Sequence, residues 1–200
     1  MITPPTSETQ PSLPMLLGKT EAVLHGHFRL SSGLHSDTYI QCARLLSHPA
    51  YAQQMGHDIA RKVQKSGVGP IDAVIGPALG GIIIAHEVAR ALSVCSLFAE
   101  RQGSDLALRR GFSIKKGQRI LVVEDVITTG KSAKETASLV LALGGVVVGY
   151  ACIVARGDSH ALSPLHCLCQ LRPQVFSETE CVLCQEGVPL HKPGSRPEAV

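Results

Sequence analysis

The sequence predicts an α/β fold with a mainly parallel sheet, and three observations support this. Short apolar runs rich in β-branched residues alternate with longer stretches of helical spacing or composition. Glycine and proline interrupt the chain between several of these segments. Two neighbouring carboxylates stand at the carboxyl end of one apolar run, where ligands bind in parallel sheets. The length of 200 residues suits one domain with a sizeable core.

The first half of the chain contains a regular series of expected elements. They are a helix over 15–24, an extended segment over 27–41 with a turn at Ser32-Gly33, a helix over 49–65, a strand over 73–75 and a helix over 80–92. The spacing of Ala52, Met55 and Ile59 places apolar side chains on one side of the third element, as in an amphipathic helix.

The second half continues the alternation. We expect a strand over 94–98, a polar loop over 101–111, a strand over 119–123, a helix over 131–143 and a strand over 146–154. The twenty residues from Thr136 to Ala155 carry no charge and are long enough to cross a membrane. Gly144-Gly145 divides helix formers from a β-branched run, however, so helix, turn and buried strand are the better interpretation.

Composition excludes several classes of protein. A net charge of +3 without long basic runs argues against a dedicated nucleic-acid binder. Residues 1–14 are polar and proline-rich without an apolar signal region, so we expect a loose, flexible N-terminal extension and a cytoplasmic protein. The seven cysteines are scattered, and without an export signal a disulfide framework is not expected.

Residues 120–132 are the most informative stretch. An apolar strand leads to Glu124-Asp125, the turn Thr128-Thr129-Gly130 follows, and a helix-forming run starts at Lys131. Carboxylates can accept hydrogen bonds from ribose hydroxyls, while turn amides and a helix N-terminus can hold a phosphate. The segment therefore predicts a site for a phosphorylated sugar. Two plainer alternatives are a solvated strand end and a metal site.

A second glycine-rich turn follows the strand at 73–75, over residues 76–81. It is either an ordinary strand-to-helix turn or a backbone pocket for diphosphate, because the missing side chains at Gly80 and Gly81 let oxygens approach the amides.

The cysteines near the C-terminus raise the question of a metal. Cys167 and Cys169 are one residue apart, and Cys181 and Cys184 are two residues apart. Four thiolates would suffice for a structural zinc site, and reduced thiols without a metal are the alternative. The histidines are dispersed and show no ligand spacing, so we name no metal ligand from the sequence.

Residues 120–132 resemble the phosphoribosyl-diphosphate motif of the type I phosphoribosyltransferases. Residues 28–39, together with Arg156, resemble orotate phosphoribosyltransferases in particular, and the resemblance extends over about 16–196. It implies one domain over 15–200: a Rossmann-like core over about 50–160, with a small hood from about 15–45 and part of the C-terminus. It also implies a homodimer and Mg²⁺ carried on the sugar diphosphate.

The implied reaction joins orotate to phosphoribosyl diphosphate and gives orotidine 5′-phosphate and diphosphate, a step in pyrimidine nucleotide biosynthesis. The resemblance gives Glu124 and Asp125 to the ribose hydroxyls, and Gly80 and Gly81 to the diphosphate. The 5′-phosphate segment comprises Val126, Ile127, Thr128, Thr129, Gly130, Lys131 and Ser132. Thr128, Arg156 and Tyr39 are the expected contacts to orotate, although Arg156 could be a surface residue and Tyr39 ordinary core.

The chain departs from the family pattern in its expected lid, residues 101–111. Relatives carry lysines and a histidine there, whereas this chain offers only Arg101, Arg109 and Arg110. Arginine stabilises charge but is a poor proton donor, so we expect Arg101 to contact diphosphate without acting as an acid. Ser31 and Gly80 also stand where some relatives have lysine. A purine phosphoribosyltransferase and a non-catalytic nucleotide-binding regulator on the same fold remain alternatives.

Overall fold

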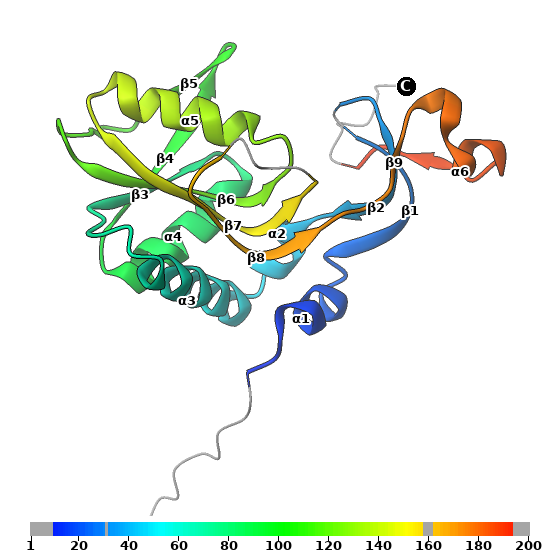
Figure 1. Cartoon of the computed structure of the whole chain (residues 1–200), viewed down its shortest axis with the longest axis horizontal. Helices are drawn as coiled ribbons and strands as arrows, with labels where there is room; N and C mark the ends of the chain where they lie inside the picture. Colours follow the sequence, from blue (N-terminus) through cyan, green and yellow to red (C-terminus); the bar gives the residue numbers. More distant parts are fainter. Residues whose placement is uncertain (1–9, 31, 158–161, 194–200) are drawn as a thin grey trace, which may run out of the picture.

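The computed structural model describes residues 10–30, 32–157 and 162–193 and contains two sheets (Figure 1). The larger sheet has six strands in the order β5-β4-β3-β6-β7-β8. Its strands are β3 (Ala73–Pro77), β4 (Cys95–Gln102), β5 (Asp105–Leu108), β6 (Arg119–Ile127), β7 (Val146–Arg156) and β8 (Leu165–Leu171). All neighbours pair in parallel except β4 and β5, which form an antiparallel hairpin. The chain thus forms the mainly parallel sheet that the sequence predicts.

The order of the strands defines where a ligand can bind. From β3 the chain passes to β4 on one side, and it then crosses to β6 and continues to β7 and β8 on the other. The strand order therefore reverses between β3 and β6. In open α/β sheets, the crevice outside the carboxyl ends of the two strands at such a point is the usual binding site.

Helices cover both faces of this sheet. α3 (Pro49–Lys65) and α4 (Gly80–Leu92) lie on one face, and α5 (Lys131–Ala142) lies on the other (Figure 1). Each face has its own apolar core, which is why the central strands are buried on both sides. Met55 and Ile59 of α3 are fully buried in the first core, as their helical spacing predicts.

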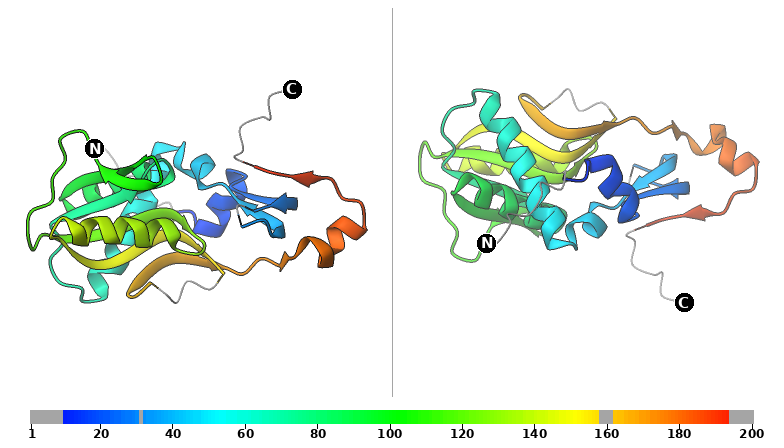
Figure 2. Two further views of the ribbon diagram at one scale, coloured as in Figure 1. Left: turned by 90° about the horizontal axis from the view of Figure 1, so that it is seen from above. Right: turned by 90° about the horizontal axis from the view of Figure 1, so that it is seen from below.

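A small second lobe lies beside the carboxyl ends of the core strands. Its four-stranded sheet has the order β10-β1-β2-β9, built from β1 (Val23–Arg29), β2 (His35–Ile40), β9 (Val175–Phe176) and β10 (Leu190–His191). We call residues 23–40 and 175–191 the hood. Figures 1 and 2 show that its C-terminal part, which includes α6 (Val182–Gln185), extends away from the core and returns to β1. α1 (Leu13–Lys19) and α2 (Cys42–Leu46) flank the junction between hood and core.

Several expectations about elements are confirmed. α3 and α4 have the predicted bounds, and the uncharged stretch at 136–155 forms the end of α5, a turn and β7. Among the described residues, no helix is long and apolar enough to cross a membrane. Residues 1–9 of the expected N-terminal extension lie outside the described residues, as does Ser31, and α1 already begins at Leu13.

Other expectations are wrong in detail. The segment 101–111 is not a loop throughout, because β4 continues to Gln102 and turns through Gly103-Ser104 into β5. The first helix ends at Lys19, and residues 23 and 24 begin β1. β6 extends to Ile127, so the acidic pair lies inside the strand. The sequence also did not indicate β8, which extends the sheet beyond β7.

Candidate active site

The acidic pair lies in the carboxyl-terminal half of β6. Glu124 is buried and 9% exposed, while Asp125 is half-buried. Burial raises the pKa of Glu124 to about 8, and the neighbouring charge of Asp125 adds to this shift. Burial also raises the pKa of Asp125, with partial compensation from backbone N–H groups. Two carboxyl groups whose charge is costly in the free protein are suited to partners that supply hydrogen-bond donors or a cation.

The glycine turn after β3 closes against Asp125. A Cβ atom at Gly80 would lie 2.8 Å from Asp125 Oδ1, and a Cβ at Gly81 would lie 2.9 Å from Pro77 Cδ. A side chain at Gly80 would displace the Asp125 carboxylate, and one at Gly81 would also meet the carbonyl oxygen of Val123 at 3.1 Å. The start of α4 and the acidic pair therefore meet at the point where the strand order reverses, and the two glycines make this approach possible.

The turn after β6 leads directly into α5. Gly130 precedes the helix with a φ of 73°, a left-handed conformation that glycine adopts without strain. Thr128 and Thr129 are exposed, so their hydroxyl and amide groups are available beside the positive end of the helix. Ile127, by contrast, is 1% exposed and packs in the core, so its contribution to a ligand can come only from its backbone.

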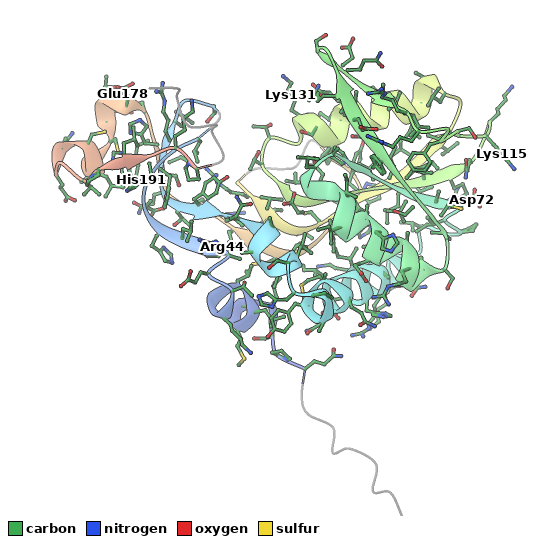
Figure 3. The ribbon with its side chains drawn as sticks, turned by 180° about the vertical axis from the view of Figure 1, so that it is seen from behind. Arg44, Asp72, Lys115, Lys131, Glu178 and His191 are labelled. Carbon is green, nitrogen blue, oxygen red and sulfur yellow. The ribbon has the colours of Figure 1, made fainter. Side chains whose placement is uncertain are left out.

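The hood closes one side of this site. A cavity of about 270 Å³ is bordered by Asp125, Val126, Thr128 and Arg156 of the core and by Tyr39 of β2. A second cavity of about 510 Å³ shares Leu30, Thr128 and Arg156 with the first. Its lining adds Ser32, Leu34, Thr129, Lys131, Gly157, Pro173 and Val175. Figure 3 shows Lys131 at the start of α5, on the side of the core that faces the hood.

Tyr39 and Arg156 share an electrostatic environment. Burial raises the pKa of Tyr39, the charge of Asp125 adds to this, and Arg156 opposes it. Burial lowers the pKa of Arg156, while Tyr39 and Asp37 act in the other direction. The Tyr39 ring also packs against Phe28, with ring centroids 5.7 Å apart. Arg156 is thus a half-buried cation next to an aromatic ring, an arrangement that can receive a planar anionic base.

The arginines of the β4–β5 hairpin have other partners. Arg101 forms an ion pair with Glu135 of α5 and donates a hydrogen bond to the carbonyl of Ser104 at 2.7 Å. Arg110 binds both carboxylate oxygens of Glu100, at 2.8 and 2.9 Å. In this conformation Arg101 therefore lies against α5. Arg109 makes no ion pair within the part of the chain that the structure describes.

The four cysteines near the C-terminus do not come together. Cys167 and Cys169 lie in β8 of the core sheet, where they pair with Cys152 and Val154 of β7. Cys181 and Cys184 lie in the hood beside two histidines, His27 and His35. The four-thiolate zinc site considered from the sequence is therefore wrong.

Sequence reasoning also missed lining residues. Arg29, Gln41 and Pro193 border the smaller cavity. Arg29 belongs to the segment 28–39 that carries the family resemblance, so that segment offered the signal, although its polar residues were not assigned individually. Nothing local marks Pro193, which reaches the site only through the folding of the C-terminal segment.

Comparison with known proteins fits this geometry. A family model described as a phosphoribosyl transferase domain matches residues 41–169. Its match spans core strands β3 to β7, the two glycine turns, the carboxylates and Arg156, and defines the chain as a phosphoribosyltransferase. Orotate phosphoribosyltransferase of Caldanaerobacter subterraneus subsp. tengcongensis is 50% identical over 180 residues, which cover 89% of this chain and 93% of the relative. The chain therefore belongs to the orotate phosphoribosyltransferase family of enzymes.

Solved structures agree with this assignment. The crystal structure of orotate phosphoribosyltransferase from Aeropyrum pernix is 28% identical with a TM-score of 0.67, and the match covers 86% of this chain and 96% of that one. The adenine phosphoribosyltransferase of Thermoanaerobacter pseudethanolicus is 17% identical with a TM-score of 0.58, covering 67% and 88%. The second likeness concerns the fold alone.

Proposed function

We propose that this site transfers the phosphoribosyl group from phosphoribosyl diphosphate to orotate, giving orotidine 5′-phosphate and diphosphate for pyrimidine nucleotide biosynthesis. The bond from C1 of the ribose to the diphosphate oxygen breaks, a bond from C1 to a ring nitrogen of orotate forms, and that nitrogen releases its proton to solvent. The observation that carries the proposal is the cavity in which Asp125 and Thr128 face Tyr39 and Arg156. It joins the expected sugar-binding residues to the expected base-binding residues.

In this proposal, the sugar phosphate binds at the segment from the end of β6 to the start of α5. Glu124 and Asp125 accept hydrogen bonds from the ribose hydroxyls, which favours their ionised forms. The 5′-phosphate binds the amides and hydroxyls of the turn, chiefly Thr128, Thr129 and Gly130, in front of the N-terminus of α5. Lys131 and Ser132 in the first helical turn complete this group.

The diphosphate binds at the turn that follows β3. The backbone amides of Gly80 and Gly81, at the start of α4 and next to Asp125, bind the diphosphate oxygens in this proposal. The carboxylate oxygens of the acidic pair are ligands of the type that Mg²⁺ prefers, and Asp125 lies close to the diphosphate turn, so the residues present fit this ion. When bound, Mg²⁺ neutralises charge on the departing diphosphate.

The base binds in the space between the hood and the core. The guanidinium of Arg156 binds the orotate carboxylate or a carbonyl through two parallel hydrogen bonds, and Thr128 contacts the same base. The ring of Tyr39 packs on its face. Catalysis then consists mainly of alignment and of charge stabilisation at C1, which becomes oxocarbenium-like as its bond to diphosphate lengthens.

The hairpin β4–β5 supplies the lid. Its closure over the substrates excludes water and brings Arg101 to the diphosphate. For this movement, Arg101 must break its ion pair with Glu135 and bind the diphosphate instead. A homodimer with sites near the subunit interface and a cytoplasmic location belong to the same proposal. Light scattering after size-exclusion chromatography measures the oligomeric state.

One assay tests the reaction. The protein is incubated with Mg²⁺, phosphoribosyl diphosphate and either orotate, adenine or hypoxanthine, and the loss of the base is followed by absorbance. Turnover with orotate alone supports the proposal. Turnover with a purine instead of orotate would refute it, and binding of nucleotide without turnover of any base would indicate a regulator.

A further inference from the structure

Two histidines and two cysteines come together in the hood. His27 lies in β1 and His35 in β2, and both side chains are 1% exposed. Phe28 pairs with Ser36 and Arg29 with His35, so the two histidines are diagonal neighbours on one face of the hairpin. Cys181 precedes α6 and Cys184 lies within it. One nitrogen or sulfur atom from each of the four residues lies within 4.8 Å of the others.

The separations match those of ligands around one tetrahedral ion. Zn–N bonds of about 2.0–2.1 Å and Zn–S bonds of about 2.3 Å place neighbouring nitrogen and sulfur ligands about 3.5 Å apart. His27 Nε2 lies 3.4 Å from Cys181 Sγ and 3.6 Å from Cys184 Sγ. His35 Nδ1 lies 3.3 Å from Cys184 Sγ. The Cys-x-x-Cys spacing is also typical of zinc ligands.

Hydrogen bonding alone satisfies this cluster poorly. His27 Nδ1 lies 2.8 Å from the carbonyl oxygen of Val188 and therefore carries the proton, which leaves one lone pair on Nε2. Three groups converge on that lone pair: Nδ1 of His35 at 2.9 Å and the sulfurs of Cys181 and Cys184. One lone pair serves one donor well. A cation bound by all four atoms satisfies each of them, and the carbonyl of Val188 fixes the His27 ring as in known zinc sites.

The hood also has little apolar core to hold it together. Its buried side chains beyond the junction with the core, among the described residues, are His27, Phe28, His35, Ser36 and Cys181. Only Phe28 among them is a large hydrocarbon, and β9 and β10 have two residues each. Small units without a sufficient apolar core commonly depend on a metal or a disulfide.

We propose that His27, His35, Cys181 and Cys184 bind one structural Zn²⁺ ion that joins the C-terminal segment to the β1–β2 hairpin. Two neutral imidazoles and two thiolates form a closed, neutral site with no position left for substrate. Cys184 is exposed, which gives the ion a path into the site.

Metal content tests the proposal directly. The whole chain is purified with a reducing agent, incubated with Zn²⁺, dialysed and analysed by mass spectrometry of the metal. We expect about one zinc per chain. The double variant Cys181→Ser/Cys184→Ser should lose it, while the matched control Cys167→Ser/Cys169→Ser should keep it. A wild-type protein without zinc, or equal loss in both double variants, would overturn the proposal.

A milder variant covers the case in which the double variant does not fold. Cys184→Ser changes one exposed ligand, and Co²⁺ reports on it. The thiolate-to-metal absorption band of the Co²⁺ protein should fall by about half when one of two thiolates is removed. An unchanged band would contradict the proposed ligands. These readouts do not depend on turnover, so a protein that binds zinc but does not consume orotate would disprove the proposed function alone.

Discussion

Glu124 gives a quantitative test of the electrostatics of the site. Its pKa in the folded protein is about 8, against 4.5 for an unperturbed glutamate, and burial is the main cause. The folded state therefore holds this proton more tightly than the unfolded state. The contribution of the Glu124 proton to the free energy of unfolding is fully present below pH 4.5 and is lost as the pH rises toward 8, because ionising the buried carboxyl then opposes folding. The loss amounts to about 3.5 kcal/mol between pH 5 and pH 8.

Glu124→Gln removes the titrating group and keeps its shape. We expect the variant to gain about 3.5 kcal/mol relative to wild type between pH 5 and pH 8, because its uncharged amide does not ionise. Urea unfolding of both substrate-free proteins at several pH values measures this difference. Glu21→Gln, at an exposed ion pair, is the control and should change stability by less than about 1 kcal/mol throughout. Parallel stability profiles of wild type and Glu124→Gln would refute the reasoning.

Three further substitutions test the roles of single residues. Asp125→Asn should reduce kcat/KM about 10- to 100-fold, because a charge-assisted hydrogen bond to the ribose is lost, while the thermal stability should change little. A variant that loses stability but keeps its activity would contradict this role. Arg156→Ala should raise the KM for orotate about 30-fold and that for phosphoribosyl diphosphate less than about 3-fold, and equal effects on both would argue against base binding. Gly81→Ala places a Cβ 2.9 Å from Pro77 Cδ and 3.1 Å from the carbonyl oxygen of Val123, and should lower kcat/KM about 100-fold. Gly18→Ala, which meets nothing within 4 Å, should leave kcat/KM unchanged.

The core and the close arrangement of the candidate site residues could be predicted from the sequence because their signals are local. α3 has the predicted bounds, with a proline at its first turn and Gly67 just beyond its end. The acidic pair, the turn and the start of α5 are consecutive in the chain, so one stretch of sequence contained the proposed sugar-phosphate site. The close approach of Gly80 to Asp125 needed only the rule that parallel strands end at the same edge.

The features that the sequence did not reveal depend on contacts between segments that are far apart in the chain or on strand pairing. Charged residues suggested a loop at 101–111, but a hairpin needs only backbone partners and a suitable turn, and Gly103-Ser104 was the overlooked signal. The histidines of the hood looked dispersed because His27 and His35 meet only through the register of β1 and β2. Cys181 lies 154 positions from His27, a contact that no local pattern can indicate.

In the proposed function, the hood links recognition of the base to stability. The core fold is shared with an adenine phosphoribosyltransferase of known structure, so the sheet alone does not select a base. In the proposed site, Tyr39 and the hood residues of the two cavities add that selection. Tyr39 stands on the β1–β2 hairpin, which has little apolar core, and His27 and His35 of the proposed zinc site lie on the same hairpin. Because the sugar-phosphate residues belong to the independently packed core, loss of the proposed zinc should weaken orotate binding before it weakens phosphoribosyl-diphosphate binding.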